Sequence, residues 1–134
     1  MSSSLLPDRE ALRSAWDIVR AQLPPTPTIR WPLLEQRLGT TVFIKHENHT
    51  ALGAFNLRGG AVYLHELLRR EPGVRGVISA TRGNHGQSIA RAAALHGLAA
   101  TIVVPRGNST EKNAAMRALG ATLVEHGDDF QQSR

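Results

Sequence analysis

The segment SATRGNHGQSIARAAALHG, residues 79–97, places a polar turn between an apolar run and an alanine-rich run. The apolar run, VRGVIS at residues 74–79, predicts a strand, and residues 87–96 predict a helix. Two glycines, Gly83 and Gly86, lie in the turn and allow the backbone to approach a ligand closely. Such a turn is typical of the carboxyl edge of a parallel sheet, where the next helix offers free backbone amides.

The alternation of strand and helix continues outward from this turn in both directions. Gly97 and Gly120 stand where helix C-caps are expected. The repeated order of strand, helix and strand predicts an α/β fold with a mainly parallel open sheet and helices on both faces. The predicted strands cover residues 41–47, 74–79, 99–104 and 121–125, and the predicted helices cover residues 56–70, 87–96 and 110–119.

The N-terminal part of the chain has a different character. Residues 8–23 show the apolar spacing of an amphipathic helix, and a proline pair ends it. The stretch PPTPTIRWP, residues 24–32, is too rich in proline for a central strand and predicts an extended connector. A short helix closed by Gly39 follows. We therefore expect residues 1–39 to form an N-terminal helix and connector, and residues 40–134 to form the α/β portion.

The composition fits an ordinary globular protein of 134 residues, with 41% hydrophobic and 20% charged residues. The net charge is +5, but the arginines are scattered among acids, so a nucleic-acid surface is not expected. The chain has no cysteine, and His46 and His49 lack the spacing of a metal site. Neither a signal peptide nor a run of membrane-spanning length is visible, which predicts a cytoplasmic protein without a membrane partner.

Two segments together resemble a known family. KHENHTALGAFNLRGG, residues 45–60, and the turn segment of residues 79–97 are similar to signature segments of the threonine/serine dehydratases, which are fold-type II pyridoxal-phosphate enzymes. The flanking residues 26–48 and 104–130 are similar in the same order. The resemblance implies the N-terminal portion of an ammonia-lyase that converts a small hydroxy amino acid to a 2-oxo acid and ammonia. It also implies pyridoxal 5'-phosphate as cofactor.

The resemblance implies roles for individual residues. The family's Schiff-base lysine stands at position 56, which is Asn56 in this chain. Phe55 would pack against the cofactor ring, and Asn84 would hydrogen-bond the ring hydroxyl. The residues that would cradle the substrate carboxylate are Thr81, Gly83 and His85. The alternatives that remain open are that Phe55 is a core aromatic and that His85 is a helix-cap residue.

Asn56 changes the expected chemistry. A side-chain amide is not basic and does not condense with an aldehyde, so covalent cofactor binding is not expected. The chain has two lysines, Lys45 and Lys112, and their positions on a strand and a later helix give no reason for either to reach the site. The family's glycine-rich phosphate loop falls beyond the matched residues, and residues 127–134 begin another helix as the sequence ends, which suggests truncation.

Three hypotheses remain open from the sequence. The first is a threonine/serine dehydratase lineage whose activity is impaired by Asn56 and by truncation. The second is a non-catalytic homologue that binds an amino acid or associates through its exposed face, for example as a homo-oligomer. The third is a decayed fragment. Arg82 stands where racemase-like relatives carry a serine, which argues against a racemase.

Overall fold

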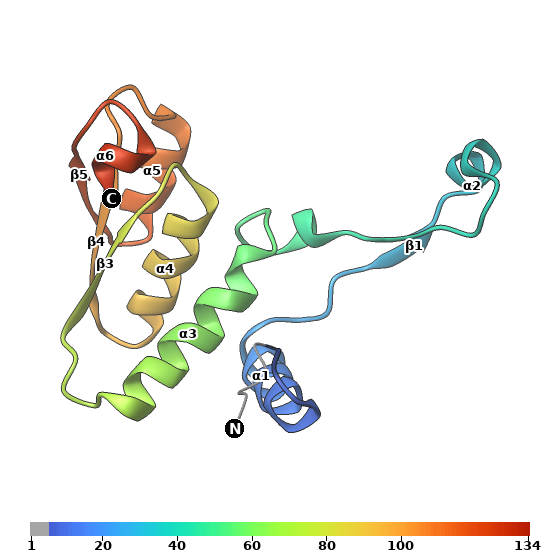
Figure 1. The fold of residues 1–134 in the computed structure, drawn as a ribbon, viewed down its shortest axis with the longest axis horizontal. Helices are drawn as coiled ribbons and strands as arrows, with labels where there is room; N and C mark the ends of the chain where they lie inside the picture. The colour runs from blue at the N-terminus through green and yellow to red at the C-terminus, as the bar shows by residue number, and fades with distance from the viewer. Residues whose placement is uncertain (1–5) are drawn as a thin grey trace.

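The computed structural model describes residues 6–134. An N-terminal helix and an extended arm precede a long helix, which leads into a compact α/β body (Figure 1). The elements are α1 (Arg9–Gln22), β1 (Thr28–Arg30), α2 (Pro32–Leu38), β2 (Phe43–Lys45), the 3-10 turn η1 (Glu47–His49), α3 (Asn56–Arg70), β3 (Gly76–Ala80), α4 (Asn84–Leu95), β4 (Ala99–Val104), α5 (Thr110–Ala118), β5 (Thr122–Glu125) and α6 (Phe130–Ser133).

The body is built on a three-stranded parallel sheet in the order β3-β4-β5. Alternate residues of β4 point to one face, where Ala100, Ile102 and Val104 are buried. Helices α4 and α5 cover that face, and they contribute Ala93 and Met116, both fully buried, to the same core. The predicted α/β class and parallel sheet are therefore confirmed, because strands with this alternation bury one face against the crossover helices.

The short helix α6 lies against the second face of the sheet. Phe130 and Ser133 of α6 line a hollow together with Ile78 and Val103. Ile78 is 73% exposed on the edge strand β3, and Val124 on β5 is 42% exposed. Helices thus lie on both faces as predicted, but their coverage is very unequal.

The predicted strand at residues 41–47 does not join the parallel sheet, so this expectation was wrong in its placement. Its central part, β2, pairs antiparallel with β1 in a separate two-stranded sheet, with Ile29 opposite Ile44. The proline-rich connector contributes β1, which the sequence did not predict. Pro27 and Pro32 flank β1 rather than interrupt it, so the missing proline amides remove no hydrogen bond from this short ladder.

Helix boundaries agree with the sequence except at the polar turn. Helix α4 begins at Asn84, three residues before the predicted start, because the Gln87 amide already donates to the Gly83 carbonyl at 3.1 Å. The first turn of α4 therefore carries Asn84 and His85, two of the residues for which the family implies a role. Gly97 and Gly120 have φ values of 66° and 87° and directly follow the C-cap residues of α4 and α5, so they end these helices as predicted.

Helix α3 connects the N-terminal part to the body (Figure 1). It packs against α4 on one side and against α1 on the other, where Val19, Leu23 and Leu57 form a small second core. The arm formed by β1, α2 and β2 extends away from both, and it leaves Trp31 and Phe43 exposed. The positions of α3 and α4 set the site described next.

Candidate functional site

A pocket of about 570 Å³ opens where the first turns of α3 face β3 and α4. It brings together Phe55, Asn56 and His85, which are distant in the sequence. Three of the six residues to which the family gives a role therefore share one cavity. The complete lining is Phe55, Asn56, Gly59, Gly60, Tyr63, Val77, Ile78, Ser79, His85 and Ile89.

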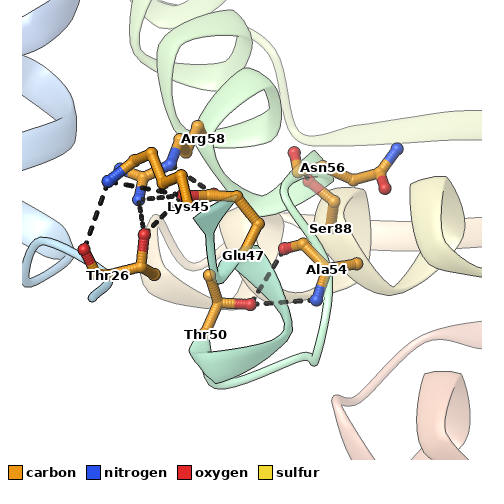
Figure 2. A network of polar contacts seen from close by, with 8 residues as sticks. All are labelled: Thr26, Lys45, Glu47, Thr50, Ala54, Asn56, Arg58 and Ser88. Atoms are coloured by element: carbon orange, nitrogen blue, oxygen red, sulfur yellow. Dashed lines mark hydrogen bonds and ion pairs between the residues drawn. The ribbon is translucent and has the colours of Figure 1, made fainter. Parts of the chain in front are cut away.

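The close crossing of α3 and α4 fixes the backbone of Asn56. A Cβ atom at Gly60 would collide with the hydroxyl of Ser88, so glycine is what lets the two helices approach. The Ser88 hydroxyl, which is buried, donates to the Asn56 carbonyl at 2.6 Å (Figure 2). The side chain of Asn56 extends away from this contact. Position 56 is thus held firmly, yet it presents an amide and no basic amine.

The loop that leads into α3 is closed by a pair of hydrogen bonds. The Ala54 amide donates to the Thr50 hydroxyl at 3.0 Å, and that hydroxyl donates to the Ala54 carbonyl at 2.9 Å (Figure 2). Phe55 follows at the N-cap of α3 and remains 66% exposed. The alternative that Phe55 is a core aromatic is therefore wrong. Its exposed ring at the pocket is placed to stack on a planar ligand.

A polar cluster of Thr26, Glu47 and Arg58 holds this loop against α3. Both oxygens of the Glu47 carboxylate accept from the Arg58 guanidinium, at 2.7 and 2.9 Å, and Oε1 also accepts from the Thr26 hydroxyl at 2.6 Å (Figure 2). The hydrogen bonds from Arg58, more than any other cause, lower the pKa of Glu47 to about 2. The Glu47 carboxylate in turn raises the pKa of Arg58. The cluster ties the connector and η1 to α3.

The turn between β3 and α4 is tightly packed. The Gly83 amide donates to the Thr81 hydroxyl at 3.1 Å, and Thr81 is only 5% exposed. A Cβ atom at Gly86 would lie 2.5 Å from both the Met116 sulfur and Thr81 Cγ2. Packing alone therefore requires glycine at position 86, and the approach of a ligand, which was the reason expected from the sequence, is not needed to explain it.

His85 lies in the first turn of α4 and does not cap the helix. Its Nε2 is 3.1 Å from the hydroxyl of Ser79, and Gly83 is the N-cap residue. The helix-cap alternative for His85 is therefore wrong. Because the first amides of a helix have no intrahelical partner, residues 84–86 present backbone donors at this turn. Such donors favour an anion such as a carboxylate.

Lys112, whose place in the sequence gave no reason to expect it at the site, reaches this turn. The Lys112 ammonium, in the first turn of α5, donates to Asn84 Oδ1 at 3.1 Å. The two residues are 28 positions apart, so no local pattern in the sequence could pair them. Lys45 behaves differently, since its ammonium donates to the Thr26 carbonyl at 3.3 Å and lies 3.8 Å from Glu47.

Metal binding and membrane insertion find no support in the part of the chain that the structure describes. Within residues 6–134 there is no group of three or more histidine, aspartate or glutamate side chains arranged to hold a metal ion. None of the helices described is long and apolar enough to cross a membrane.

A family model described as pyridoxal-phosphate dependent enzyme matches residues 19–134. The chain belongs to this family. The biosynthetic L-threonine dehydratase of Pasteurella multocida is 37% identical over 109 residues, which cover 81% of this chain and 21% of the relative. The L-threonine ammonia-lyase of Thermotoga maritima is 36% identical over 101 residues, which cover 75% of this chain and 25% of the relative. The chain thus spans a fifth to a quarter of these two relatives.

Solved structures agree with the sequence comparison. Isoform 2 of threonine deaminase from Solanum lycopersicum superposes with a TM-score of 0.77 at 30% identity. The match covers 98% of this chain and 40% of the deaminase chain. A pyridoxal 5'-phosphate-dependent aspartate racemase superposes with a TM-score of 0.87 at 28% identity. This match covers 96% of this chain and 41% of the racemase chain. The predicted family, fold-type II architecture and family cofactor are confirmed.

The residues present fit the family's cofactor only in part. Phe55 offers an exposed ring at the pocket, and the Asn84 amide offers a donor at the adjacent turn. Asn56, however, lines the pocket where covalent attachment needs a primary amine. Non-covalent contact with the ring is therefore compatible with this chain, and a covalent link at position 56 is not. The roles of Thr81, Gly83, His85, Phe55 and Asn84 remain predictions.

Proposed function

We propose that this chain is the N-terminal portion of a threonine/serine dehydratase-type enzyme, and that as it stands it has no ammonia-lyase activity. In this proposal residues 1–39 are a helix and connector, and residues 40–134 carry the ring contact and the carboxylate turn. The observation that carries the proposal is the position of Asn56. It lines the same pocket as Phe55 and His85, and it stands at the position where the resemblance places the family's Schiff-base lysine.

The chemistry requires an amine at that position. When pyridoxal 5'-phosphate is bound, it supplies an electron sink that makes loss of the α-proton and then of the β-hydroxyl feasible. The protein must supply a base to take that proton. In this family the lysine that holds the cofactor also moves the proton. An asparagine amide can donate and accept hydrogen bonds but cannot take up a proton near neutral pH. The remaining residues can bind and orient a ligand, which is a separate task.

A second candidate function, non-catalytic binding of a small hydroxy amino acid, is favoured by the intact turn. The first amides of α4 lie at the turn that also holds His85 and Ser79, and such amides would suit the substrate carboxylate that the family implies. Binding of a carboxylate there needs no lysine at position 56. Association with a second copy of the chain belongs to the same hypothesis, because Ile78 and Phe43 are exposed.

The test compares the natural chain with the variant Asn56→Lys. Purified protein is incubated with threonine or serine and pyridoxal 5'-phosphate, and 2-oxobutanoate and pyruvate are measured. We expect no product above the protein-free control. After borohydride reduction, mass spectrometry should find the cofactor at position 56 in Asn56→Lys and not in the matched control Asn56→Gln. Turnover at enzymatic rates by the natural chain would overturn the proposal.

The second candidate is tested by calorimetric titration with threonine and serine, together with a light-scattering mass. Heat that saturates with threonine but is absent with the amino alcohol threoninol would support a carboxylate site, because threoninol lacks that group. Absence of both binding and association would eliminate the second candidate.

A further inference from the structure

Lys112 lies across the polar turn although it comes from another helix. Its ammonium donates to Oδ1 of Asn84, the first residue of α4. The side chain runs directly over Gly83, because a Cβ atom at Gly83 would collide with its methylene groups and lie 2.9 Å from Nζ. None of the ion pairs among the described residues includes Lys112. Asn84 is therefore the side chain toward which this ammonium is directed.

The chemistry of the two groups fixes the orientation of the Asn84 amide. An ammonium group carries three donors and no acceptor, so only the amide oxygen can face it. Oxygen and nitrogen of an asparagine amide are otherwise hard to tell apart, and their assignment depends on the surrounding hydrogen bonds. Here the donor-only partner settles the assignment. The NH2 group of Asn84 must consequently point away from Lys112, with two donors available to a ligand.

We propose that Lys112 is a positioning residue that holds the Asn84 amide so that its NH2 group faces the ligand. The proposal rests on the proposed function for the identity of that ligand, whose ring hydroxyl oxygen would accept from Asn84. An amide held this way selects an oxygen acceptor, whereas a reversed amide would select a donor. Gly83 serves the same arrangement, since a side chain there would displace the lysine.

Substitutions at position 112 separate orientation from simple structural support. Lys112→Arg keeps a donor-only group, so the amide orientation should be unchanged. Lys112→Glu supplies an acceptor-only carboxylate, which should hold the same amide in the reversed orientation. A carboxylate in the first turn of α5 is also favourable to the helix dipole, so this variant should fold. Both variants retain a hydrogen bond to Asn84, and only the atom that makes it differs.

The first measurement needs no ligand. The side-chain amide signals of Asn84 are identified in the ¹⁵N-labelled protein by their loss in Asn84→Asp. They should stay in place in Lys112→Arg and shift in Lys112→Glu, where the amide nitrogen becomes the bonded atom. Gly83→Ala should also shift them, because its Cβ atom displaces the lysine. Equal spectra of Lys112→Arg and Lys112→Glu at these signals would overturn the positioning role.

The second measurement uses pyridoxine 5'-phosphate, which has the ring hydroxyl but no aldehyde and so cannot condense with any amine. Calorimetry should show similar dissociation constants for the natural chain and Lys112→Arg, and about tenfold weaker binding for Lys112→Glu. The 3-deoxy analogue controls for charge, because it lacks the ring hydroxyl. Lys112→Glu should weaken the binding of pyridoxine 5'-phosphate more than that of the 3-deoxy analogue. The difference between the two losses of affinity measures the effect of the Asn84 amide orientation.

The two measurements fail separately. If the spectra behave as expected but Lys112→Glu weakens both ligands equally, Lys112 positions the amide and the ring contact of the proposed function is wrong. If the two position-112 variants give equal spectra, the positioning role is wrong, whatever the ligands do.

Discussion

Replacement of Glu47 by glutamine should loosen the loop that leads into the pocket. The Glu47 carboxylate joins Thr26 of the connector to Arg58 of α3 through three short hydrogen bonds. Glutamine has nearly the same shape but carries no charge and offers one oxygen instead of two. The substitution therefore removes the charge-assisted contacts and leaves the local packing in place.

The expected loss can be worked out from the pKa of Glu47. A lowering from 4.5 to about 2 corresponds to at most about 3.4 kcal/mol, at about 1.36 kcal/mol per pKa unit. The Glu47 side chain is 22% exposed and that of Arg58 is 27% exposed, so solvent screens part of this interaction. We therefore expect Glu47→Gln to reduce the free energy of unfolding by about 1–2 kcal/mol at neutral pH.

The pH dependence gives the sign of the effect. Because the folded protein holds the pKa of Glu47 below its unfolded value, the stabilisation is fully present above about pH 4.5 and is lost as the pH falls toward 2. The stability difference between the natural chain and Glu47→Gln should thus shrink over that interval. Urea unfolding at pH 7 and near pH 3 measures both differences. A difference that is equal at both pH values would refute the assigned role of the carboxylate.

Two further predictions concern the packing around the site, and a third concerns an exposed ion pair. Gly86→Ala should lower the free energy of unfolding in urea by about 1–3 kcal/mol, because its Cβ atom meets Met116 and Thr81. The matched control Gly59→Ala, whose Cβ atom would meet nothing within 4 Å, should stabilise α3 by about 0.5–1 kcal/mol. Equal effects of the two substitutions would contradict this packing. Ser88→Ala should cost about 0.5–1.5 kcal/mol by removing the interhelical hydrogen bond to the Asn56 carbonyl, which keeps its bond within α3, and unchanged thermal unfolding would show that the contact is dispensable. Arg106→Ala should change stability by under about 1 kcal/mol, since its ion pair with Asp128 is exposed, and a larger loss would contradict the low value given to exposed pairs.

The periodicity of the chain was sufficient to predict the body of the fold. The helix of residues 56–70 and the strand of residues 99–104 are found where they were predicted, because their apolar spacing is local and matches the face that they bury. The start of α4 was misplaced because Asn84, His85 and Gly86 are polar or flexible and carry no helical pattern. Only the hydrogen bond from the Gln87 amide to the Gly83 carbonyl shows that the helix has already begun.

The family, the α/β order and the absence of a lysine at position 56 were determined by the sequence alone, since each is a property of neighbouring residues or of a local motif. The tertiary structure decided which of these residues meet. It placed Asn56 and His85 in one pocket by crossing α3 over α4 at Gly60, and it brought Lys112 to Asn84 from a different helix. The sheet pairing of β2 was decided in the same way. Contacts of this kind depend on the packing of whole elements, for which a linear pattern of residues holds no signal.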